Sequence, residues 1–316
     1  MAALVNASKP GDPGFDVTSD MIYEEWHDPR LSLDEDTWVA VTPEGEYAAA
    51  VEIWFEEPDE APADEPVTRH IGLAVHPDYR ESHLALIKQL FEGALERAMG
   101  RPLADPTRPA VLRMWAPAND AWKQEWISSY GFQYTHCGFT LIHDRLDELP
   151  ALPRVPNVEI RAWQPQLDYD LWQVVNACFS DDPTYVDLSW EEWNRIYHDS
   201  PKVDPNLWRL AVDSRTDEIV GFLLSEIDNI ALDVGSPQEG WITDLAVLPD
   251  WRGRGVRALL VRPALDGMHG AGVREVLAGV GSFSPTVATR HYDAVGFRIL
   301  RGVCTYLRPF SQQAES

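Results

Sequence analysis

The sequence has few cysteines, few basic residues and no long apolar run. Its 316 residues include only Cys137, Cys178 and Cys304, and no two of these are spaced as Cys-x-x-Cys. Thiols this few and scattered exclude a disulfide framework and a cysteine-ligated metal site, and they favour a reduced, cytoplasmic protein. No uncharged apolar run approaches the roughly 18 residues of a membrane span, and residues 1–10 lack a signal-peptide pattern. We therefore expect a soluble protein with no membrane partner.

Basic residues are scarce: 26 Lys and Arg stand against 51 Asp and Glu, for a formal net charge of −25. This balance argues against broad contact with nucleic acid or an anionic membrane. The charge is uneven, because residues 252–308 hold nine Arg and three acids, whereas residues 157–251 hold 19 acids and five bases. The basic segment suits a small anion. The acidic segment is either a solvated surface or one that attracts a cationic amine.

The chain repeats itself once. The segment Leu73-Ala-Val-His-Pro-Asp-Tyr-Arg80 recurs as Leu245-Ala-Val-Leu-Pro-Asp-Trp-Arg252, and Gly131-Phe132 recurs as Gly296-Phe297. Because the order is kept over so long an offset, the repeat indicates a duplicated domain rather than a solenoid. Three prolines within residues 149–156 mark the boundary. The sequence therefore predicts two domains, at residues 1–150 and 157–316.

Each copy alternates strand-like and helix-like segments, which predicts a mixed α/β fold. In the second copy we expect strands at 158–161, 207–212, 219–227, 241–248, 275–280 and 297–307, and helices at 167–179, 190–198, from about 254, and at 285–295. Pro263 should kink or end the third of these helices. In the first copy, a strand equivalent to 158–161 would precede Met1. The first domain either lacks that strand or begins downstream of it.

The most informative segment is Asp244-Leu-Ala-Val-Leu-Pro-Asp-Trp-Arg-Gly-Arg-Gly-Val-Arg257. It reads as a buried strand, a tight turn with two glycines, and a helix. Glycine lets the backbone approach a ligand closely, and a helix N-terminus presents unpaired N–H groups, so the turn predicts a pyrophosphate cradle. A surface turn rich in Arg and Gly is the alternative. The residues expected to contact the anion are Arg252, Gly253, Arg254, Gly255, Val256 and Arg257.

The pattern Arg252-x-x-Gly255-x-Arg257 resembles the acyl-CoA signature of the GCN5-related N-acetyltransferase (GNAT) superfamily. The preceding Leu245-Ala246-Val247 is similar to the fourth strand of that family, and Tyr292-Asp-Ala-Val-Gly-Phe is similar to its late helix-to-strand element. The resemblance implies two tandem GNAT-like domains, each a mostly antiparallel sheet flanked by helices. It also implies acetyl-CoA as co-substrate and no metal.

Two departures from the family pattern fall in the second copy, and the first copy departs further. Arg257 stands where the family has Gly or Ala, and Pro285 stands where an Asn is common. In the first copy the loop reads Arg80-Glu-Ser-His83 without glycine, and Ile127 takes the place of Tyr292. We expect the first copy to be a degenerate partner that binds no CoA. The arrangement resembles that of the mycothiol synthases, tandem members of the same superfamily.

The resemblance implies direct attack of an amine on the thioester of acetyl-CoA. The backbone of residues 245–247 would pair with the pantetheine arm, and Tyr292 would protonate the leaving thiolate, unless it only packs on the sheet. Alternation along the strand puts Asp244 and Ala246 on the face directed to the cleft, so Asp244 is the first candidate base. Glu226 is the second. Either carboxylate could instead be solvated or bonded to the backbone.

Together these features predict an N-acetyltransferase that is active in the second domain. It would move an acetyl group from acetyl-CoA to a primary amine of a small molecule. The alternatives are an acyltransferase that uses a longer acyl-CoA, and a catalytically silent acyl-CoA-binding sensor or scaffold. We expect no nucleic-acid partner, and the tandem copies predict a monomer or a weak homodimer.

Overall fold

The computed structural model describes residues 1–9, 17–28, 30–56, 65–149, 154–181, 185–199, 203–228, 239–282 and 292–311. The chain divides into two compact units. Unit 1 comprises Met1–Gly138 and Arg301–Ser316, and unit 2 comprises Phe139–Leu300. The divisions fall inside strands β5 (Gln133–His143) and β11 (Arg298–Phe310), so each of these strands gives residues to both units. The predicted domains instead divide the chain within residues 150–157.

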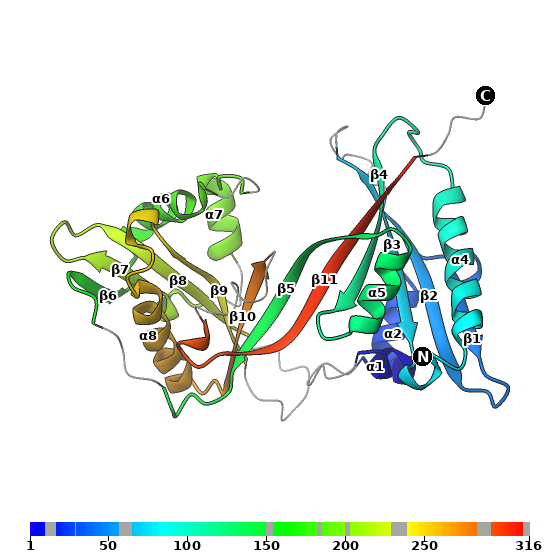
Figure 1. Ribbon diagram of the computed structural model, residues 1–316. Coiled ribbons are helices and arrows are strands. Elements are labelled where there is room, and N and C mark those ends of the chain that lie inside the picture. Colours follow the sequence, from blue (N-terminus) through cyan, green and yellow to red (C-terminus); the bar gives the residue numbers. More distant parts are fainter. Residues whose placement is uncertain are drawn as a thin grey trace. The chain divides into compact units, whose positions relative to one another are not determined.

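Unit 1 is a mixed sheet with helices (Figure 1). Its helices are α1 (Ala2–Ala7), α2 (Ser19–Trp26), α3 (Leu33–Asp36), α4 (Leu84–Gly100) and α5 (Ala121–Ser129). Its own strands are β1 (Thr37–Val41), β2 (Tyr47–Glu56), β3 (Val67–Val75) and β4 (Ala110–Pro117). The strand order is β1-β2-β3-β4-β11-β5. The pairs β1–β2, β2–β3 and β4–β11 are antiparallel, and β3–β4 is parallel.

Unit 2 repeats this plan with one more strand. Its helices are α6 (Asp168–Phe179), α7 (Trp190–Tyr197) and α8 (Val256–Gly270). Its own strands are β6 (Val158–Ala162), β7 (Arg209–Asp213), β8 (Ile219–Asp228), β9 (Glu239–Val247) and β10 (Glu275–Ser282). The strand order is β5-β10-β9-β8-β7-β6. The pairs from β6 to β9 are antiparallel, and β9–β10 is parallel.

The predicted fold class is confirmed, and the predicted elements of the second copy match the observed ones within a few residues. Of the two effects expected of Pro263, it does not end α8, which continues to Gly270. In the described part of residues 1–36 the regular elements are helices, so β1 is the first strand of unit 1. Pro285 and most of the helix predicted at 285–295 lie outside the described residues. Among the described helices, none is long and apolar enough to cross a membrane.

The core of unit 2 fixes the helices that border the site. Leu171 of α6 and Trp193 of α7 are fully buried against Phe222 of β8 and Ala246 of β9. Helix α7 begins with a capping box, in which the side chains and backbone amides of Ser189 and Glu192 bond reciprocally. Packing and capping together hold the last turn of α7 beside the middle of β9.

Two of the three cysteines are paired. Cys137 of β5 and Cys304 of β11 form a disulfide, and Cys178 is a buried free thiol. The expectation of three reduced thiols was therefore wrong. The two partners are 167 residues apart in sequence, and their approach depends on β11 lying between β4 and β5. Because nothing in the spacing of the cysteines encodes that pairing of strands, sequence reasoning could not find the bond.

Candidate active site

Strands β9 and β10 separate partway along their length. They pair in parallel from Glu239–Ile242 with Glu275–Ala278, and the described residues show no ladder between them beyond these four pairs. Strand β9 nevertheless stays paired with β8 as far as Val247. Apart from the carbonyl of Val247, which accepts from Arg252, the edge of residues 244–247 that faces away from β8 therefore keeps backbone donors and acceptors for an extended ligand.

A β-bulge marks the point of separation. Leu224 of β8 lies opposite Asp244, whereas the next residue, Ser225, lies opposite Ile242. Thr243 is therefore the extra residue of β9. A bulge bends the strand and increases its twist, which redirects the side chain that follows it. That side chain is Asp244, the first candidate base.

The loop after β9 has the backbone that the glycine pattern predicts. Gly253 has φ of 74° and Gly255 has φ of 87°, both in the left-handed region. Gly255 is the N-cap of α8, and no side chain caps that end of the helix. The first amide groups of α8 are thus left for an outside acceptor, with the positive end of the helix dipole behind them. This arrangement suits a phosphate or pyrophosphate.

The arginines of the loop have different surroundings. Arg252 donates to the carbonyls of Val247 (3.1 Å) and Cys178 (2.8 Å) and forms an ion pair with Asp181, so its side chain fastens the loop to β9 and α6. Arg254 is exposed, with its guanidinium 5.0 Å from the ring centre of Trp251. The side chain of Arg252 therefore positions the loop, and Arg254 lies where it can meet an anion.

Asp244 is a half-buried carboxylate with a specific donor. The hydroxyl of Tyr197, the last residue of α7, donates to Asp244 Oδ2 over 3.0 Å. Burial raises the pKa of Asp244 above its usual value, while hydrogen bonds from Tyr197 and Thr243 act in the opposite direction. A carboxyl group with a raised pKa is a better base than an exposed one.

Tyr292 lies close enough to Asp244 and Arg257 to interact with both electrostatically. Burial raises the pKa of Tyr292 to about 12, with Asp244 adding to the shift and Arg257 opposing it. Its ring packs edge-on against Phe297, with centroids 5.3 Å apart. At neutral pH the phenol is therefore protonated and able to donate. Burial also lowers the pKa of Arg257, which is half-buried in the same place.

The other predicted residues lie as follows. Glu226 is half-buried on β8, and alternation puts it on the same face as Leu224 and hence as Asp244. The side chain of Ala246 shares that face but packs into the core with α6 and α7, so the expectation that it lines the cleft was wrong. Leu245 is half-buried and Val247 is buried. No group of three His, Cys, Asp or Glu side chains in the described ranges could hold a metal ion.

Sequence reasoning missed Tyr197 and Asp181. Tyr197 reaches Asp244 from a helix 47 residues earlier, and Asp181 reaches Arg252 from 71 residues earlier. The only available signal was the position of Tyr197 at the end of a predicted helix. Such contacts are set by how α6 and α7 pack on the sheet, which local sequence patterns do not encode.

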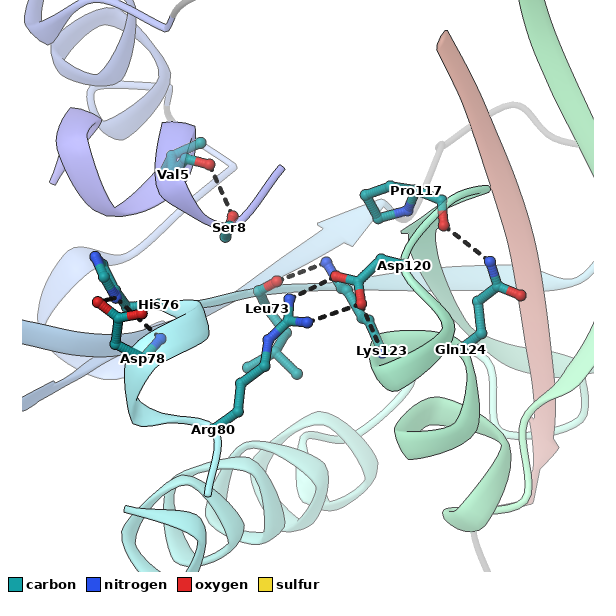
Figure 2. A network of polar contacts seen from close by, with 10 residues as sticks. All are labelled: Val5, Ser8, Leu73, His76, Asp78, Arg80, Pro117, Asp120, Lys123 and Gln124. Carbon is teal, nitrogen blue, oxygen red and sulfur yellow. Dashed lines mark hydrogen bonds and ion pairs between the residues drawn. The ribbon is translucent and has the colours of Figure 1, made fainter. Parts of the chain in front are cut away.

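In unit 1, strands β3 and β4 also separate partway along their length, but side chains of unit 1 occupy the space between them. Strands β3 and β4 pair only from Val67–His70 with Ala110–Arg113. Beyond that point, Lys123 of α5 donates to the carbonyl of Leu73 over 2.6 Å, and Arg80 forms an ion pair with Asp120 at 2.6 Å (Figure 2). The carbonyl of Leu73 is the counterpart of the one on Leu245 in the repeat. The counterpart of the ligand-pairing edge is thus partly occupied.

Known proteins resemble this chain in sequence. Residues 169–297 match the Acetyltransferase (GNAT) family. A mycothiol acetyltransferase from Renibacterium salmoninarum is 25% identical over 74% of this chain, and this chain spans 65% of its length. Another from Acidothermus cellulolyticus is 27% identical over 77% of this chain and 70% of its own length.

Solved structures agree with the sequence relatives. A GCN5-related N-acetyltransferase from Sphaerobacter thermophilus superposes with a TM-score of 0.65 at 22% identity, covering 100% of this chain and 93% of that one. A tandem GNAT protein from the clavulanic acid biosynthesis pathway gives a TM-score of 0.50 at 18% identity, covering 98% and 94%. Unit 2 therefore contains a GNAT-type acyltransferase domain. The chain as a whole is similar in fold to tandem GNAT proteins and in sequence to the mycothiol acetyltransferases.

Proposed function

We propose that unit 2 transfers an acetyl group from acetyl-CoA to a primary amine of a small molecule. The observation that carries this proposal is the convergence of three features on one end of β9. These are the left-handed glycine loop at α8, the exposed strand edge at residues 244–247, and the half-buried hydroxyl and carboxyl groups of Tyr292 and Asp244. A turn that was only a surface loop rich in Arg and Gly would require neither the exposed strand edge nor the adjacent hydroxyl and carboxyl groups.

The loop fits the pyrophosphate of acetyl-CoA, and the strand edge fits its pantetheine arm. The pyrophosphate would accept hydrogen bonds from the amides at the start of α8, with Arg254 adding positive charge. A Cβ built on Gly253 would meet nothing within 4 Å, so the loop is open on that side. The amide groups of the pantetheine arm would pair with the backbone of residues 244–247, as a short added strand.

Asp244 and Tyr292 would share the two proton transfers. The amine nitrogen forms a bond to the thioester carbon, and the electron pair of the carbonyl moves to its oxygen, which a β9 amide stabilises. Asp244 accepts the proton that the attacking nitrogen loses. When the tetrahedral intermediate collapses, the carbon–sulfur bond breaks and Tyr292 donates its proton to the thiolate. Glu226, on the same face of β8, is the alternative acceptor of the proton.

The acceptor would be a small molecule with a cationic amine. Residues 157–251, which include α6 and α7, hold 19 acids and five bases, and this excess would draw an ammonium ion towards the site. The names of the relatives suggest an acceptor related to mycothiol, at 25 to 28% identity. A cytoplasmic location, and a monomeric or weakly dimeric state, remain predictions from the sequence.

A thiol-release assay tests the proposal. Acetyl-CoA is incubated with the full chain and a panel of primary amines, and free CoA is measured with a thiol reagent. We expect release with at least one amine, and a loss of about 10²–10⁴-fold in kcat for Tyr292→Phe with unchanged affinity for acetyl-CoA. Glu81→Ala, in the counterpart loop of unit 1, is the matched control. Tight binding of acetyl-CoA without release for any amine would instead support a silent sensor.

A further inference from the structure

The carboxyl group of Asp168, at the start of α6, accepts hydrogen bonds from three ring N–H groups. Trp163 Nε1 donates to Oδ1 over 3.1 Å, and Trp193 Nε1 donates to Oδ2 over 3.2 Å. His198 Nε2 lies 3.0 Å from Oδ2 and 3.1 Å from Oδ1. Since an ionised carboxylate only accepts, Nε2 of His198 carries the proton and is the third donor. Asp168 therefore joins the segment after β6 to both the middle and the end of α7.

Two of these donors flank Tyr197 in the chain. Trp193 is one helical turn before it, and His198 directly follows it as the C-cap residue of α7. The ring centroids of Trp193 and Tyr197 are 4.4 Å apart. The Tyr197 ring also meets Trp208 edge-on at 6.2 Å, and the indole of Trp208 donates to a carbonyl of β8 over 3.1 Å. Tyr197 therefore packs on two tryptophans, and each of these has its indole N–H hydrogen bonded.

The contacts of Asp168 are shielded from water. Trp193 has no exposed surface, and the side chains of Asp168 and His198 are 14% and 24% exposed. Hydrogen bonds to a carboxylate are stronger than those between neutral groups, and shielding from water strengthens them further. Asp170, in the same first turn of α6, is exposed instead. Asp168 is therefore more than a charge at the positive end of the helix dipole.

We propose that Asp168 is a positioning residue for the candidate base Asp244, and that it acts through Tyr197. By holding the residues before and after Tyr197, Asp168 keeps the tyrosine hydroxyl 3.0 Å from Asp244 Oδ2. Without that support the ring of Tyr197 can turn, and its hydrogen bond to the base weakens. The inference rests on the proposed function, in which Asp244 accepts the proton of the attacking amine.

The groups around Asp244 determine how such a loss can be measured. Tyr197 and Thr243 donate hydrogen bonds that lower the pKa of Asp244, against a larger effect of burial. Tyr185 and Tyr292 interact with Asp244 electrostatically. Of these four groups, Tyr197 is the one that belongs to α7. A weaker bond from Tyr197 should therefore raise the pKa of Asp244 while the other three groups stay in place.

The test follows the ionisation of Asp244 directly, by carbon-13 NMR of the full chain labelled at its aspartate carboxyl carbons. Asp244→Asn assigns the signal. Asp168→Asn keeps the shape of the side chain but leaves one acceptor oxygen, so it cannot serve both Trp163 and Trp193. We expect it to move the titration midpoint of Asp244 up by about 0.5–1 pH unit, the size of change that the loss of one hydrogen bond gives.

Three further variants separate positioning from a general structural effect. Asp170→Asn, the matched control, removes the same charge from the same turn of α6 and should leave the midpoint unchanged. Asp168→Asn combined with Tyr197→Phe should titrate like Tyr197→Phe alone, because the hydroxyl through which Asp168 acts is gone. Circular dichroism checks folding. Trp193→Phe keeps a ring but lacks the N–H, so it should raise the midpoint in the same direction even if Asp168→Asn does not fold.

The proposal is overturned if folded Asp168→Asn titrates like the wild type, or if its shift adds in full to that of Tyr197→Phe. The NMR measurement needs no substrate, so its outcome is separate from that of the thiol-release assay. A shifted midpoint in a chain that acetylates no amine would support the positioning role and contradict acetyl transfer. In an active chain, the acidic limb of kcat/KM should move with the midpoint, and the KM for acetyl-CoA should not change.

Discussion

At the residue scale, the contact between Tyr197 and Asp244 tunes the candidate base. Burial raises the pKa of Asp244, and the hydroxyl of Tyr197 counters part of that effect by stabilising the ionised carboxylate. A base must be ionised to accept a proton, so activity should fall as the pH drops through the raised pKa of Asp244. The pKa of Tyr292, raised to about 12, keeps the acid protonated throughout the neutral range.

This balance predicts a shift in the pH profile of Tyr197→Phe. Loss of the hydrogen bond should raise the pKa of Asp244 further, so the acidic limb of kcat/KM should move to higher pH. The measurement is CoA release against pH with one amine for both proteins, so that titration of the amine itself cancels. Tyr185→Phe is the control, because Tyr185 donates to Asn176 and not to Asp244. An unchanged acidic limb in Tyr197→Phe would exclude Asp244 as the base.

The sequence was enough to propose Asp244 and Tyr292 as candidate catalytic residues, but it did not predict their surroundings. Asp244 and Tyr292 were found because they stand at fixed positions beside a recognisable strand and a Gly-Phe pair. The hydrogen bond from Tyr197 to Asp244 and the ion pair between Asp181 and Arg252 were not predicted, because both join segments far apart in the chain. The side chain of Ala246 was misplaced because alternation gives the shared face but not which neighbours cover it.

At the element scale, α7 and the start of α8 border the candidate site. Helix α7 presents Tyr197 from its last turn, and its first turn depends on the capping box of Ser189 and Glu192. Helix α8 starts directly after Gly255, whose φ of 87° is costly for any residue with a Cβ. The order of strands and helices around these elements was predictable, because hydrophobic periodicity and turn residues are local signals.

Removing the cap of α7 should destabilise unit 2. Ser189→Ala removes the hydroxyl that accepts a hydrogen bond from the amide of Glu192, and should lower the free energy of unfolding by about 0.5–2 kcal/mol. Chemical denaturation measures the change. Ser180→Ala is the control, since the Ser180 hydroxyl only donates to the carbonyl of Ala177 on an exposed turn. Equal stability of the two variants would show that the cap contributes nothing.

At the scale of the whole molecule, duplication has given two copies that differ at the separated strand edge and at the loop that follows it. Unit 2 keeps an open strand edge and a glycine loop, whereas unit 1 fills the same edge with Lys123 and pairs Arg80 with Asp120. The duplication itself was visible in the sequence. The pairing of β11 with β4 was not, because the partners of a strand at the end of a chain depend on the fold of the rest.

The disulfide between Cys137 and Cys304 predicts the thiol content. Protein purified without reductant should show one thiol per chain in denaturant, from Cys178, and a slow reaction when native, because burial raises the pKa of that thiol to about 12. The Cys178→Ser variant should show no thiol in the same measurement. Reduction should lower the free energy of unfolding by about 2–4 kcal/mol. Three thiols in denaturant before reduction would show that the bond does not form in the isolated protein.

The central claim is that the second copy alone binds acetyl-CoA. Calorimetric titration of the full chain with acetyl-CoA tests this claim most directly. The structure predicts one site per chain, which Gly255→Asp abolishes by placing a strained backbone and a negative charge in the loop, and which Glu81→Ala leaves unchanged. Two sites per chain, no binding at millimolar acetyl-CoA, or undiminished binding by a folded Gly255→Asp variant would each contradict it.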